Sequence, residues 1–194
     1  SSRFTLMHNY NNGMINNKFK NIYDSNSKDE NLFRAKFMFI PNELIKMSLT
    51  LYYIDLNNKY DNWTPDNNGF TTYTDYQGYD KQKTNAFSLK SKFQIFKGSI
   101  THIISYSKNN MNYSYDGDWA NDVYWQNPPY NWDSDAEGYE WNYPDNTLRN
   151  RKTRTNELRI NKIINNNLDA TIGIYFSETI ENDNRTGYLF AGYA

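Results

Sequence analysis

Alternation of apolar and polar residues is the dominant pattern along this chain. Residues 31–40 read NLFRAKFMFI. The three phenylalanines share one face of this segment, whereas Arg34 and Lys36 share the other. Strict alternation of this kind predicts a β-strand with one apolar side.

Similar alternation recurs through most of the sequence, and no segment competes with it by repeating apolar residues at the helical period of about 3.6. His102 interrupts the apolar face of one strand, and the first thirty residues are less regular. The further strands predicted in this way cover residues 3–9, 14–23, 44–56, 87–95, 99–111, 151–164, 168–176 and 187–194.

The connections between these strands alternate in length. Short turns are predicted at residues 41–43, 97–98 and 165–167, and the long polar stretches 57–83 and 112–150 separate the hairpins that they form. A shorter connection is predicted at 181–186. The strands, at about 10 to 14 residues, exceed the usual soluble strand of about 5 to 6 and suit a tilted membrane strand of about 9 to 11. We therefore expect an all-β fold, an antiparallel up-and-down transmembrane β-barrel segment with short periplasmic turns and long extracellular loops.

Composition narrows the alternatives. The mean hydropathy of −0.96 is low, but aromatic residues make up 18% of the chain, which is unlike a disordered protein. A net charge of −1 gives no field that would gather nucleic acid, so we expect no nucleic-acid partner. The absence of cysteine excludes disulfides and thiolate metal sites. A soluble β-sandwich would show the same periodicity, and remains the alternative fold.

The long stretch 112–150 contains four of the five tryptophans and many tyrosines. Flat rings bury a large area and stack on sugars or planar chelates, so this stretch is the candidate for capturing a ligand. The competing interpretation is that the rings pack the loop against its neighbours. The candidate residues are Trp119, Tyr124, Trp125, Tyr130, Trp132, Tyr139 and Trp141.

Charge is segregated around this stretch. The loop holds eight acidic residues with no lysine or arginine among them, which fits simple solvation, with a Ca²⁺ site or divalent bridging to lipopolysaccharide as alternatives. A basic run follows it, and Arg151, Glu157 and Arg159 share one strand face. We expect these three side chains to face a wet lumen as an ion-pair ladder, since a charge facing lipid is costly, although the basic run could also steer an anionic ligand.

Four segments, in order, resemble recurring segments of TonB-dependent outer-membrane receptors. Residues 51–61 read LYYIDLNNKYD and are similar to a strand end that opens a loop in that family, with Lys59 where glycine is common. The other three are TYTDYQGYDKQ at 72–82, YSYDGDW at 113–119 and RNRKTRTNELR at 149–159. They resemble, respectively, a return into the next strand, the opening of a long extracellular loop and the strand after that loop.

The resemblance implies a receptor for energised uptake of a scarce nutrient in the bacterial outer membrane, with a ferric siderophore as the first candidate ligand and cobalamin, haem or a glycan as others. It also implies a plug inside a 22-stranded barrel and contact with TonB. Residues 1–194 contain neither the plug nor the C-terminal strands of the family, so we expect a partial barrel domain from a longer protein.

No catalytic motif for phosphate binding, zinc hydrolysis or serine nucleophiles is present, so we expect no enzyme activity, no cofactor and no resident metal. The expected partners are a small nutrient ligand, outer-membrane lipid, and TonB through a plug region outside this chain. Two other functions fit the same pattern: a soluble all-β glycan-binding module, and a passive porin-type barrel.

Overall fold

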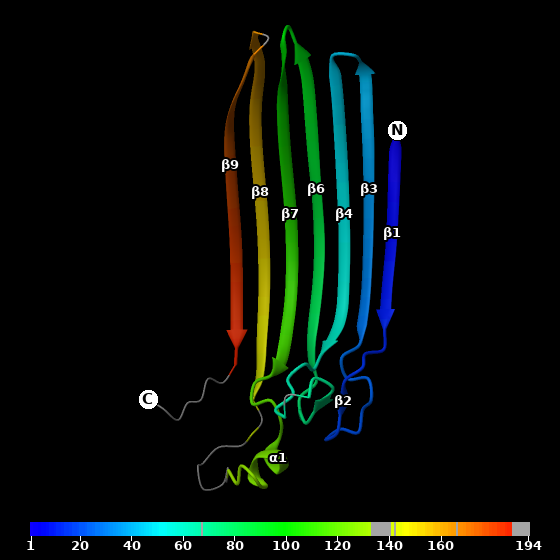
Figure 1. The fold of residues 1–194 in the computed structure, drawn as a ribbon, viewed down its shortest axis with the longest axis vertical. Helices are drawn as coiled ribbons and strands as arrows, with labels where there is room; N and C mark the ends of the chain where they lie inside the picture. The colour runs from blue at the N-terminus through cyan, green and yellow to red at the C-terminus, as the bar shows by residue number, and fades with distance from the viewer. Residues whose placement is uncertain (67, 133–140, 142, 166, 188–194) are drawn as a thin grey trace, which may run out of the picture.

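Seven long strands form one antiparallel sheet in the computed structural model, which describes all residues except 67, 133–140, 142, 166 and 188–194 (Figure 1). Apart from two short strands, neighbours in the chain are neighbours in the sheet, so the expected all-β antiparallel up-and-down fold is confirmed. The sheet order is β1 (Ser2–Asn11), β3 (Lys28–Asn42), β4 (Ile45–Tyr60), β6 (Gly78–Ile95), β7 (Gly98–Asp116), β8 (Pro144–Asn165) and β9 (Leu168–Thr186). Within the described residues β1 and β9 each pair with one neighbour, and the sheet is open.

The two ends of the sheet differ, as the sequence predicts. One end carries the short turns that join β3 to β4, β6 to β7 and β8 to β9, and the other collects the long connections (Figure 1). Asparagine side chains close two of the turns: Asn42 Oδ1 accepts from the backbone N–H of Leu44 at 3.0 Å, and Asn165 Oδ1 accepts from that of Asn167 at 2.9 Å. Asparagine favours turns for this reason.

The strands extend further toward the long connections than the alternation predicts. The predicted connection at 181–186 is wrong, because β9 continues to Thr186 opposite Asn146 on β8. In this half the strands are rich in asparagine and charged residues, so apolar alternation gives no signal. Backbone pairing nevertheless continues there, supported by side-chain contacts such as the 2.6 Å ion pair between Arg149 and Asp183.

The register sorts the side chains onto two faces. Phe37, Leu49, Leu89 and Ile104 stand opposite one another across four strands, and similar rows run on either side of them. We call this side of the sheet the apolar face. The opposite side, the polar face, carries mostly Lys, Arg, Ser, Thr and Glu, for example along the row Lys36, Thr50, Ser88, Ser105, Thr155 and Ser177.

No second layer covers the apolar face within the described residues. Phe39 is 62% exposed, Ile172 75% and Phe176 60%. Along β8 most polar positions are the more buried members of the alternation: Thr155 is half-buried, whereas Leu158, on the apolar face of the same strand, is 40% exposed. This is the reverse of a sheet that packs its apolar side onto a core.

The described parts of the long connections 12–27, 61–77 and 117–143 pack together into what we call the loop module (Figure 1). It holds the two-residue strands β2 (Asn16–Asn17) and β5 (Thr71–Thr72), which pair in parallel, and the helix α1 (Asp122–Gln126). Of the five buried apolar side chains in the described chain, only Ala35 belongs to the sheet; Ile15, Ala120, Trp125 and Trp141 belong to the module. No helix in the described residues is long and apolar enough to cross a membrane.

The predicted strand at 14–23 is wrong, because only two of its residues form a strand. Asn17 is 1% exposed and its side-chain amide donates to Asp61 Oδ2 at 3.1 Å and to Thr74 Oγ1 at 2.7 Å. Asp61 also accepts from Thr72 Oγ1 at 2.9 Å and Thr74 Oγ1 at 2.8 Å. A buried carboxylate therefore joins the first two long connections.

Replacing Asp61 by Ala should destabilise the loop module, because it leaves the buried hydroxyl donors of Thr72 and Thr74 without an acceptor, at about 1–3 kcal/mol for each unsatisfied group. Denaturant unfolding followed by tryptophan fluorescence measures the change. The matched control is Asp66→Ala, since Asp66 is an exposed loop carboxylate bonded only to Asn68. Equal stability of the two variants would contradict the role given to Asp61.

Candidate functional site

Several of the predicted ligand-binding residues are part of the aromatic core of the loop module. Trp125 is 6% exposed and Trp141 4%, and their ring centroids lie 5.7 Å apart. Tyr124 and Tyr130 pack against this core, with centroids 5.4 Å apart. These four candidates therefore hold the module together. Tyr139 lies outside the described residues.

Short polar contacts fix this core in place. Asn121 caps α1, and its Oδ1 accepts from the backbone N–H of Tyr124 at 3.0 Å. The Trp125 indole donates to the carbonyl of Asp118 at 3.1 Å, and Asp122 Oδ1 accepts from the backbone N–H of Trp141 at 2.8 Å. A helix of five residues is too short to show a periodic pattern, so it could not be predicted from the sequence.

Three tryptophans present their rings to solvent. Trp132 is 47% exposed and stacks on Trp125 with centroids 4.9 Å apart. Trp119 is 45% exposed and stacks on Trp63, which is 46% exposed, with centroids 5.4 Å apart and ring planes 23° apart. The Trp63–Trp119 pair joins two connections that are far apart in the sequence, so Trp63 was not among the predicted ligand residues.

The backbone at Trp119 has φ of 71°, in the left-handed region that bulky residues rarely adopt. Next to it, the Asp118 carboxylate accepts from the backbone N–H groups of Ala120 at 3.2 Å and Tyr143 at 3.0 Å. These bonds hold the chain on either side of the strained residue. Strain of this kind tends to occur at functional positions, which supports a role for the exposed ring of Trp119.

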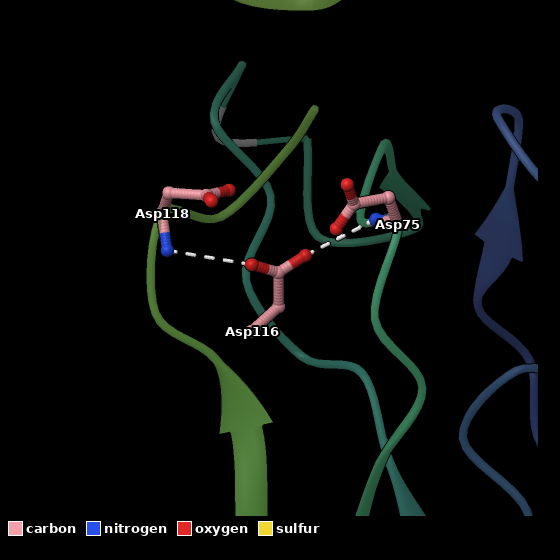
Figure 2. Close-up of side chains that lie close together, drawn as sticks. All are labelled: Asp75, Asp116 and Asp118. Atoms are coloured by element: carbon pink, nitrogen blue, oxygen red, sulfur yellow. Dashed lines mark hydrogen bonds between the residues drawn. The ribbon is translucent and has the colours of Figure 1, made fainter. Parts of the chain in front are cut away.

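Three carboxylates meet where the loop module joins the sheet (Figure 2). Asp116 at the end of β7 accepts from the backbone N–H of Asp75 at 3.1 Å and from that of Asp118 at 3.3 Å. Asp116 is 3% exposed and Asp118 4%. Oδ1 of Asp75 is shielded from solvent and has no hydrogen-bond partner in the described part of the chain.

Burial raises the pKa of all three groups, and the charge of Asp118 raises the pKa of the other two further. Burial first, and then the neighbouring Asp118, raise the pKa of Asp116 to about 8. The same two causes raise the pKa of Asp75 to about 6, and burial raises that of Asp118. The three groups therefore share protons near neutral pH.

Within the described residues this is the only group of three such side chains whose ligand atoms all lie within 4.8 Å of one another, close enough to surround a cation. Backbone N–H groups already occupy the oxygens of Asp116 and Asp118, which favours proton sharing over metal binding. Asp75 lies some forty residues before the other two along the chain, so no local pattern predicts that the three carboxylates meet.

The charged residues predicted on β8 do share the polar face. Glu157 forms an ion pair with Arg159, and Arg151 forms one with Glu181 of β9. Arg149 continues the series with Asp183. Whether this ladder faces a lumen depends on the larger assembly and stays a prediction.

Comparison of the chain with protein-family models, with curated proteins and with solved structures returns no match. Function is therefore inferred from the residues of this chain.

The three-carboxylate cluster predicts that the loop module loses stability as pH rises. A carboxyl group whose pKa is higher in the folded than in the unfolded state binds more protons when folded, so its stabilising effect is complete below about pH 4 and is lost as pH rises through about 8. Tryptophan fluorescence during unfolding at pH 5, 7 and 9 measures this. Asp116→Asn should flatten the profile, since it removes the most buried negative charge.

The control is Asp66→Asn, which removes an exposed loop carboxylate. Its pH profile should match that of the unmodified protein. A module whose stability rises between pH 5 and 9 would overturn the assignment.

Proposed function

We propose that the chain forms part of the wall of a transmembrane β-barrel in a bacterial outer membrane, and that this barrel is a TonB-dependent receptor. The observation that carries the proposal is the uncovered apolar face of the sheet. Exposed apolar patches of this extent mark contact with another apolar phase. We assign lipid to the apolar face and an aqueous lumen to the polar face.

The height of the apolar face supports lipid as its partner. On β4 the apolar positions run from Ile45 to Tyr53, eight residue steps, which span about 27 Å at about 3.4 Å per residue. The apolar band of an outer-membrane barrel is about 25 Å tall. Beyond Tyr53 the same face carries Asp55 and Asn57, so it becomes polar toward the loop module.

The unpaired edges of β1 and β9 imply that further strands complete the proposed barrel. Unpaired backbone groups in lipid cost several kcal/mol each, so an open sheet is not stable in a membrane. The proposal therefore requires further strands beside β1 and β9, and a plug region outside this chain through which TonB would act.

The positions of the four receptor-like motifs in the sheet also support the assignment to a TonB-dependent receptor. The motif at 51–61 covers the loop-side end of β4, and that at 72–82 leads back into β6. The motif at 113–119 covers the end of β7, and that at 149–159 lies on β8. In each case the position agrees with the part that the matching receptor segment plays.

In this proposal the loop module binds the ligand. The Trp63–Trp119 pair and Trp132 offer the flat rings that stack on planar chelates or on sugars. A ferric siderophore is the first candidate ligand, with cobalamin, haem or a glycan as alternatives. The same rings support the second candidate function, a glycan-binding module, in which a second sheet would cover the apolar face.

Membrane insertion tests the facing of the sheet. Leu49→Arg places a charge in the middle of the apolar face and should cost about 2–4 kcal/mol of insertion. Thr50→Arg, one residue along β4 and on the polar face, should insert normally. The measurement is the fraction of each full-length variant recovered in outer membranes after alkaline extraction. Equal recovery of both would contradict the lipid assignment.

Uptake tests the receptor. Deleting the gene in its host should abolish uptake of radiolabelled iron presented as a ferric siderophore. In the full-length gene, Trp63→Ala combined with Trp119→Ala should reduce uptake at least tenfold at unchanged membrane levels, because the stacking surface is lost. Phe70→Ala is the control, since Phe70 is 63% exposed in the same module and has no ring contact in the described residues. Unchanged uptake after deletion would overturn the siderophore assignment.

A further inference from the structure

Lysines gather on the polar face close to the short turns, far from the loop module. They surround a hollow of about 350 Å³. Lysine supplies four of the six side chains that line it, and none of the six is acidic. The lining residues are Lys36, Met38, Lys46, Ser48, Lys90 and Lys92.

The register forces these like charges together. Lys46 on β4 stands directly opposite Lys92 on β6, and Lys36 on β3 stands directly opposite Arg3 on β1. Like charges directly opposite each other destabilise an antiparallel sheet. Two such pairs within four neighbouring strands concentrate positive charge beside the hollow, where a bound anion would relieve the repulsion.

Glu157 acts on Lys90 at a distance, but no ion pair or side-chain hydrogen bond in the described residues relieves the repulsion between the lysines. None of the four lysines has an ion pair, a side-chain hydrogen bond or an aromatic ring beneath it in that part of the chain. The nearest acidic residue on this face, Glu157, lies two strands from Lys90 across Ile103 and is already paired with Arg159. Elsewhere on the sheet Arg149, Arg151 and Lys83 have acidic partners, whereas Lys108 and Lys152 have no ion pair within the described residues.

We propose that this hollow binds a small multivalent oxyanion, of the phosphate or polycarboxylate class. Ammonium groups bind such anions as point charges, and several around one hollow neutralise several negative charges at once. The hydroxyl of Ser48, opposite Lys90, adds a neutral donor on the same wall. The volume lies at the small end of the range for ligand pockets, which fits a compact anion.

The site rests on the register of β1, β3, β4 and β6 and holds whether or not the sheet lies in a membrane. If the polar face lines a lumen, as proposed above, the anion binds at the end of the lumen opposite the loop module. Anion binding is measured on purified protein, so its failure is distinct from a failure of uptake or of insertion.

Isothermal titration calorimetry of the full-length protein with pyrophosphate, and separately with citrate, tests the proposal. At least one anion should bind with a defined stoichiometry, and sodium chloride at the same ionic strength should not replace it. Lys46→Gln combined with Lys92→Gln should weaken binding at least tenfold. Binding of pyrophosphate alone assigns the phosphate class, and binding of citrate alone the polycarboxylate class.

The chain offers a matched control. Lys108 and Lys152 also stand directly opposite each other, but on the apolar face and outside the hollow. Lys108→Gln combined with Lys152→Gln removes the same charge and should leave binding unchanged. If both double variants bound the anion equally weakly, the loss would reflect the overall charge of the protein, and the site would be overturned. Binding of neither anion by the unmodified protein would also overturn the site.

A second measurement separates a binding role from a structural one. Removing Lys46 and Lys92 relieves their repulsion, so the double variant should unfold at a higher denaturant concentration than the unmodified protein at low salt, and pyrophosphate or citrate should stabilise only the unmodified protein. If the double variant does not fold, Lys90→Gln, which faces Ser48, takes its place with the same expected loss of binding. Full binding by a folded variant would overturn the proposal.

Discussion

The structure depends on one constraint: a sheet of seven long strands has an apolar face that no part of the described chain covers. Backbone pairing can hold the strands in register, but it gives no reason for Phe39, Ile172 and Phe176 to stand exposed to water. Burial of apolar area is the main force that stabilises folded proteins, and among the described residues Ala35 is the only apolar side chain that the sheet buries. The sheet is therefore completed by something outside the described residues, and lipid, as proposed above, fits the height of the apolar face on β4.

The loop module is stabilised differently from the sheet. Its stability comes from a small tryptophan core together with buried carboxylates, of which Asp61 accepts from three side chains and Asp116 from backbone N–H groups. Polar groups buried in this way are costly when unpaired, so they define one arrangement of three connections. That arrangement keeps the rings of Trp63, Trp119 and Trp132 exposed on a rigid support. A rigid aromatic surface loses little entropy when a ligand stacks on it.

The sequence predicted the sheet where side chains alternate and failed where they do not. Residues 31–40 read plainly as a strand because phenylalanine alternates with basic residues. The continuation of β9 through Glu181 and Asp183 was missed because its partners are charged residues on β8 rather than an apolar row. The meeting of Asp75 with Asp116 could not be predicted, since it depends on how two loops fold against each other. The opposed lysines 46 and 92 are visible only once the register is known.

The facing of β4 is the central claim, and it can be measured with a single attached spin label, because residues 1–194 contain no cysteine and any cysteine elsewhere in the full-length protein can be replaced by serine. Leu49→Cys and Thr50→Cys would each be labelled in the full-length protein reconstituted in lipid bilayers. The account predicts that the label at position 49 is relaxed by oxygen, which dissolves in lipid, and is shielded from a water-soluble nickel chelate, whereas the label at position 50 meets the chelate. A label at position 49 that the nickel chelate reaches as readily as at position 50 would contradict it.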